Sequence, residues 1–119
     1  MELAAKLQIK PGQRLACLAG TGDVPLVAAE GVTTVDAPEE ADVVVAFVHS
    51  RADLDTVAAP AIEGARRDKL VWIAYPKAGQ LGTDLNRDIL REALVAQGVK
   101  PVRQVAIDEV WSALRFRPA

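Results

Sequence analysis

Hydrophobic residues along the chain form continuous runs, short β-branched stretches and helical stripes. Residues 41–48 and 70–75 are almost entirely apolar and do not alternate with polar positions. Such runs are typical of strands buried on both faces of a parallel sheet. Residues 14–19 predict a further strand, and the β-branched stretch 32–36 predicts a short strand at a sheet edge. These four segments predict the parallel part of one sheet.

Between the two central runs, the pattern changes to helical spacing. Ser50 and Asp53 form a capping-box-like start for a helix. Pro60 lies inside the same apolar stripe, so we expect that helix to be kinked or split. Shorter helices are expected over residues 3–9 and 24–29.

The most regular helical stripe follows the second central strand, over residues 85–96. Thr83 can cap this helix, Asp84 can complement its dipole, and Gly98 can end it. We therefore predict a structural role for Thr83 and Asp84. Strand, glycine-bearing loop and helix together form one β-loop-α unit, and in open α/β sheets such units collect ligands.

The last two segments, residues 102–107 and 110–116, predict an antiparallel pair of strands. The chain as a whole then predicts a single α/β domain over residues 1–119. Its sheet has about six mostly parallel strands in the order 2-1-3-4-6-5, with helices on both faces and an antiparallel last strand.

Composition narrows the classes of function. The chain has 119 residues, of which 50% are hydrophobic, and a formal net charge of −2. This charge offers no basic field for nucleic acid, and no apolar run approaches the roughly 18 residues of a membrane span. The single cysteine, Cys17, is expected in the core and needs no oxidising compartment. A cytoplasmic protein is the expectation.

Polar residues follow the predicted parallel strands at their carboxyl ends, which meet at one edge of a sheet. We expect them to rim one crevice for a small anionic or nucleotide-like ligand, with Lys77 as a charge partner and the amides of Thr83 and Asp84 as donors. The Asp84 carboxylate would compete with such an anion. The predicted rim consists of Gly20, Thr21, Gly22, Asp36, His49, Ser50, Tyr75 and Lys77.

No motif for catalysis or metal binding accompanies these residues. His49 is the only histidine, so a zinc site would have to take its remaining ligands from carboxylates. Cys17, Ser50 and Ser112 do not lie in a nucleophile elbow. We predict no catalytic residue, no metal and no cofactor.

Basic and aromatic residues gather on the two closing strands. Arg103, Arg115 and Arg117 share this edge with Trp111, which is expected to be about half covered. Charges at a sheet edge discourage edge-to-edge pairing, which is one interpretation. The other is a contact surface for a homodimer or a protein partner, because Arg and Trp are frequent interface anchors.

The segment LQIKPGQRL (residues 7–15), followed by Gly20-Thr21-Gly22, resembles the cofactor loop region of class I, S-adenosylmethionine-dependent methyltransferases. The resemblance implies a three-layer Rossmann-like fold and places Asp36 where an acidic residue holds the ribose hydroxyls. However, the glycine turn is short, and residues 36–41 leave no room for a strand and helix that normally intervene. We therefore predict that S-adenosylmethionine does not bind usefully.

Three segments resemble a family of small bacterial proteins known only as a domain of unknown function. They are LVWIAYPK (residues 70–77), TDLNRD (83–88) and DEVWSALRFR (108–117). This resemblance extends over the whole chain and implies no reaction. Two functions stay open: a non-enzymatic ligand-binding or protein-interaction module, which we favour, and a small enzyme acting on a nucleotide or S-adenosylmethionine-type ligand.

Overall fold

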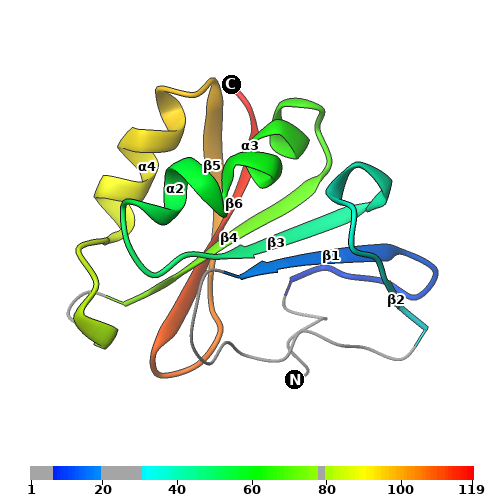
Figure 1. The fold of residues 1–119 in the computed structure, drawn as a ribbon, viewed down its shortest axis with the longest axis horizontal. Helices are drawn as coiled ribbons and strands as arrows, with labels where there is room; N and C mark the ends of the chain where they lie inside the picture. Colours follow the sequence, from blue (N-terminus) through cyan, green and yellow to red (C-terminus); the bar gives the residue numbers. More distant parts are fainter. Residues whose placement is uncertain (1–6, 20–30, 78–79) are drawn as a thin grey trace.

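Six strands form one sheet, which is the centre of the computed structural model (Figure 1). The structure describes residues 7–19, 31–77 and 80–119. The strands are β1 (Arg14–Ala19), β2 (Thr33–Thr34), β3 (Val43–Phe47), β4 (Leu70–Pro76), β5 (Val99–Ala106) and β6 (Trp111–Pro118). The helices are α2 (Asp53–Thr56), α3 (Ala59–Arg66) and α4 (Arg87–Val95), with 3-10 turns η1 (Pro38–Glu40) and η2 (Gln80–Gly82).

The strand order is β2-β1-β3-β4-β6-β5, as the sequence predicts. β1 lies parallel to both β2 and β3, and β3 lies parallel to β4, with Val45 opposite Trp72. β6 lies antiparallel to both of its neighbours, β4 and β5. The result is a mixed sheet in which the carboxyl end of β4 lies beside the beginning of β6.

The predicted three-layer Rossmann-like fold is wrong. The helices that the structure describes, α2, α3 and α4, all lie on one side of the sheet (Figure 1). Right-handed crossovers that advance in one direction along a sheet place their helices on the same face, and the connections from β3 to β4 and from β4 to β5 both advance that way. The chain is therefore a small mixed α/β domain, and in the described residues the helices lie on one face instead of the two that its alternating pattern led us to expect.

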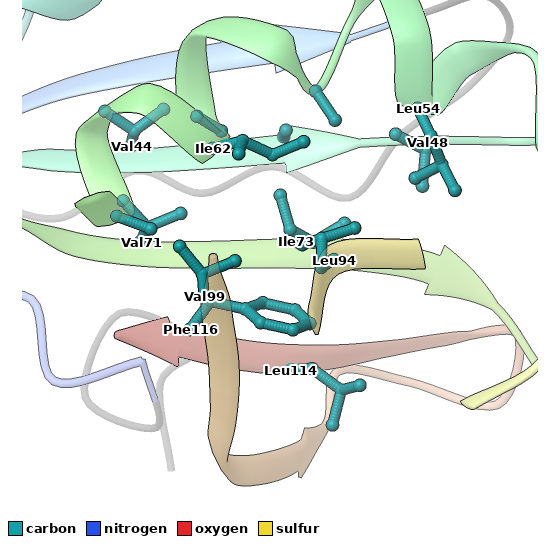
Figure 2. Packing of buried hydrophobic residues seen from close by; sticks show 14 of the residues in the cluster. Val44, Val48, Leu54, Ile62, Val71, Ile73, Leu94, Val99, Leu114 and Phe116 are labelled. Atoms are coloured by element: carbon teal, nitrogen blue, oxygen red, sulfur yellow. The ribbon is translucent and has the colours of Figure 1, made fainter. Parts of the chain in front are cut away.

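The helical face contains the larger core. Val44 of β3 and Val48, which follows β3, pack with Ile73 of β4, Ile62 of α3 and Leu94 of α4 (Figure 2). Each of these side chains is at most 4% exposed. Alternate residues of β6, Leu114 and Phe116, join the same cluster. This packing fixes α4 against the sheet at the end where β4 stops.

The opposite face has a second core, covered in the described residues by Leu7 and Ile9. The indole nitrogen of Trp72 donates a buried hydrogen bond of 2.8 Å to the carbonyl of Leu7. Trp111 is only 3% exposed, not half covered, because its ring packs edge-on against Phe47 with a centroid separation of 5.3 Å. Cys17 is exposed, so the prediction of a core cysteine is wrong.

The split of the first helix is as predicted, whereas the caps of both predicted helices differ from the expected ones. The first helix is split into α2 and α3, with Pro60 in the first turn of α3, as its position predicts. Ser50 provides no side-chain cap, and the Asp53 carboxylate instead accepts from the amide of His49 at 2.8 Å. The second helix, α4, begins three residues later than a Thr83 cap would place it, because Asn86 is its cap.

Gly98 ends the turn after α4 with a φ of +89°, a backbone conformation that suits glycine and few other residues. In the ranges that the structure describes, no helix is both long and apolar enough to cross a membrane.

Candidate ligand-binding cleft

A cleft of about 670 Å³ lies on the helical face, at the carboxyl end of β4. The end of β4, the first turn of α4 and the facing ends of β5 and β6 border it, and it is open to solvent. Its size falls within the roughly 300–1,000 Å³ that is typical of small-molecule sites. The lining residues are Tyr75, Lys77, Asn86, Arg87, Asp88, Gln104, Ala106 and Ser112.

Tyr75 and Ser112 form the inner part of the cleft. They lie directly opposite each other on β4 and β6, and each is only 3% exposed. The Ser112 hydroxyl donates to the carbonyl of Val105 at 3.3 Å and lies 3.4 Å from Nε2 of Gln104. The Tyr75 hydroxyl is not one of the buried side-chain atoms that lack a partner, which in the described residues are Nδ1 of His49 and Nε of Arg115. Tyr75 lines the cleft, so its hydroxyl can bond a ligand or water there.

The first turn of α4 forms one wall. The Asn86 side chain accepts a hydrogen bond of 2.9 Å from the amide of Ile89, which is the N-cap geometry. Arg87 extends toward the sheet, where Nη1 lies 3.5 Å from Oε1 of Gln104, and its Nε is 3.8 Å from the Asp88 carboxylate. The wall therefore carries one cation, one anion and the positive end of a helix dipole.

Lys77 lines the cleft at the end of β4. Its backbone amide donates to the carbonyl of Val110 at 2.7 Å, so the residue is fixed against the start of β6. Since Val71, Ile73 and Tyr75 face the helical side, strand alternation directs Lys77 to the same side. Its ammonium makes no ion pair with any described residue.

Thr83 and Asp84 do not line the cleft and do not cap α4. The Thr83 hydroxyl donates to the carbonyl of His49 at 2.8 Å and accepts from the amide of Leu85 at 3.0 Å. The Asp84 carboxylate accepts from the amide of Arg51 at 2.8 Å. The two side chains therefore join the loop after β4 to the loop after β3, which is a structural role different from the one predicted.

The other residues of the predicted rim lie elsewhere. His49 lies on the opposite face, where its ring packs edge-on against Trp111 at 5.1 Å and Nδ1 lies 3.8 Å from the Asp53 carboxylate. Asp36 is exposed after β2, at the far edge of the sheet. Gly20, Thr21 and Gly22 lie outside the described residues. Of the predicted rim residues that the structure describes, only Tyr75 and Lys77 line the cleft.

The residues of the predicted contact surface on the two closing strands also do not form one exposed group. Trp111 is buried, and Arg117 forms an ion pair with Asp68 at 3.0 Å. Arg115 donates to the Gln8 side chain at 2.9 Å. Arg103 is exposed and lies opposite Arg115 on β5. Two of the three arginines thus have partners within the chain.

Several lining residues were missed at the sequence level, namely Asn86, Arg87, Asp88 and Gln104. Asn86 was detectable, because asparagine is at least as good a cap as threonine and Ile89 follows three residues later. No sequence pattern identifies Gln104, because its place in the cleft depends on the register between β5 and β6.

The shifted pKa values belong to groups outside the cleft. A backbone hydrogen bond from Arg14 lowers the pKa of Asp42, and a side-chain hydrogen bond from Arg117 lowers that of Asp68. Partial burial of the thiol raises the pKa of Cys17, even though the residue as a whole is exposed. Among the described residues, no three histidine, cysteine or carboxylate side chains are grouped as metal ligands.

A comparison of the chain with protein-family models finds no match, and a comparison with curated proteins finds none either.

Proposed function

We propose that this protein is a non-enzymatic binding module whose small-molecule ligand occupies the cleft between β4, β6 and α4. The observation that carries the proposal is the cleft itself, whose inner part holds Tyr75, a side chain that is 3% exposed and whose hydroxyl bonds no described residue. A phenol in this position can donate a hydrogen bond to a ligand and accept one from it.

The groups around Tyr75 support binding. Ser112 and Gln104 are already held by protein contacts, so the inner part of the cleft is fixed before a ligand arrives. Preorganised polar groups bind with little ordering cost. The side chains that line the cleft provide hydrogen-bond donors and charges that a small polar ligand can contact.

The experiment begins with native mass spectrometry of the purified protein, to detect a retained small molecule. A thermal-shift screen of neutral and anionic metabolites follows, with the wild type beside Tyr75→Phe and Ser112→Ala. We expect at least one compound to stabilise the wild type, and Tyr75→Phe to weaken that effect. If no compound binds, or if the substitutions leave every binding event unchanged, the cleft is not the site.

We also propose that the chain belongs to the small bacterial family that its segments 70–77, 83–88 and 108–117 resemble, and that it acts in the cytoplasm. The single cysteine supports this compartment, because a fold with one thiol forms no internal disulfide.

A further inference from the structure

The charges around the cleft differ from those of the chain as a whole. The chain has a formal net charge of −2. The cleft is lined by two cations, Lys77 and Arg87, and by one carboxylate, Asp88. Its local balance is therefore positive, which favours an anion over a neutral or cationic ligand.

Backbone amides at the start of α4 add to the positive potential of the cleft. The Asn86 side chain satisfies the amide of Ile89, and the amide of Leu90 donates to the carbonyl of Asn86. The amides of Arg87 and Asp88 make no hydrogen bond with the described chain. α4 has nine residues, so its first turn carries the positive end of a full helix dipole. Two free amides at such a position bind anions well.

Tyr75 gives independent evidence for a ligand at the same place. It comes from β4, not from α4, its side chain is 3% exposed and lines the cleft, and its hydroxyl bonds no described residue. A phenol can donate a hydrogen bond to an oxygen of the anion. Donors thus come from a strand end, a helix terminus and two cationic side chains.

We infer that the cleft binds the phosphate group of a small phosphomonoester, with Lys77, Arg87, the first amides of α4 and the Tyr75 hydroxyl as its donors. This inference rests on the proposed binding function. A phosphomonoester has three terminal acceptor oxygens and nearly two negative charges at neutral pH, so it can use donors from several directions at once. The remaining volume of the cleft accommodates the organic part of the ligand.

Asp88 provides an internal control for this inference. Its carboxylate lines the same cleft and lies 3.8 Å from Nε of Arg87, so it repels a bound phosphate and competes for the guanidinium. Asp84, whose carboxylate was expected to compete, is held by the amide of Arg51 and does not line the cleft. Neutralising Asp88 should therefore strengthen binding.

Isothermal titration calorimetry at low ionic strength tests the inference, with inorganic phosphate, ribose 5-phosphate and ribose as probes. We expect phosphate and ribose 5-phosphate to bind and ribose to bind at least about tenfold more weakly. Lys77→Met and Arg87→Met should each weaken ribose 5-phosphate about five- to tenfold. Asp88→Asn should strengthen it about two- to fivefold, an effect that added salt reduces.

Arg91→Met is the matched control, because Arg91 is exposed one turn further along α4 and does not line the cleft. It should change affinity less than about twofold. Failure to bind either phosphate compound, or equal losses in Arg91→Met and Arg87→Met, would overturn the inference. If a neutral compound binds and Tyr75→Phe abolishes that binding, the proposed function stands and the phosphate inference alone fails. If no compound binds at the cleft, both fail.

Discussion

The charged side chains at the two ends of the sheet differ in whether they have partners within the chain. At the amino ends of β3 and β4, charges have partners within the chain. Arg14 and Asp42 approach to 3.6 Å, Arg117 and Asp68 to 3.0 Å, and Lys69 donates to the carbonyls of Pro38 and Glu39. These contacts close the end of the sheet and leave little for a ligand to satisfy.

At the carboxyl end of β4, the same kinds of group are left without such partners. The ammonium of Lys77 has no ion pair and the Tyr75 phenol has no hydrogen bond, as far as the described residues show. The loops after β3 and β4 are nevertheless joined by hydrogen bonds of the Thr83 and Asp84 side chains. The difference indicates that one end uses charge for stability, whereas the other holds polar groups ready on a fixed scaffold.

The largest expected effect concerns the tie between the two loops at the cleft end. Thr83→Val removes the hydrogen bonds to the His49 carbonyl and from the Leu85 amide, and should lower the free energy of unfolding by about 1–3 kcal/mol. Thr56→Val is the control, because Thr56 is exposed and should change stability by less than about 0.5 kcal/mol. Denaturant titration measures both. Equal stability of the two variants would show that the cleft end is not held by this contact.

Substitution of one lysine at each end of the sheet compares how much the two side chains contribute to the free energy of unfolding. Lys69→Met removes a donor to two carbonyls and should cost about 1–2 kcal/mol of unfolding free energy. Lys77→Met removes no contact within the described chain and should stay within about 0.5 kcal/mol of the wild type. Thermal and denaturant unfolding decide between them. A larger loss of unfolding free energy in Lys77→Met than in Lys69→Met would show that the charge at the carboxyl end, not the one at the amino end, stabilises the fold.

The smallest expected effect is a dependence of stability on pH at the amino end. The pKa values of Asp42 and Asp68 are lowered in the folded state by hydrogen bonds from Arg14 and Arg117. Folding is therefore favoured above the unfolded pKa of about 4, and this contribution is lost as pH falls through the lower folded values.

The variant Asp42→Asn/Asp68→Asn should then lose less stability than the wild type between about pH 5 and pH 2. Unfolding midpoints across that range give the comparison. Both carboxylates are exposed, so the difference should be modest and should decrease in high salt. An equally steep pH dependence in the variant would mean that these two pairs do not stabilise the fold.

Local patterns predicted much of the fold. The apolar runs at residues 41–48 and 70–75 placed the two central strands, and Pro60 predicted the break between α2 and α3. The start of α4 was missed because Thr83 and Asn86 are both good caps, and only the contact of Thr83 with His49 decides between them. The placement of the described helices on one face depends on the path of the crossovers, which periodicity does not encode.

The candidate site was less predictable than the strands. Tyr75 and Lys77 were recognised from their place at a strand end, but His49, two residues after β3, faces the other side of the sheet. Gln104 and Ser112 reach the cleft through the pairing of β5 with β6, which links residues eight positions apart. Such cross-strand sets appear only when register is known.

The central claim is that the carboxyl end of β4 binds a small phosphate compound and that the amino end does not. Titration of the protein with ribose 5-phosphate, followed in its amide NMR spectrum, tests this most directly. We expect saturable shifts for the amides of Lys77, Arg87 and Asp88, and none for those of Arg14, Asp42 or Asp68. Shifts concentrated at the amino end, or an unchanged spectrum at millimolar ligand, would contradict it.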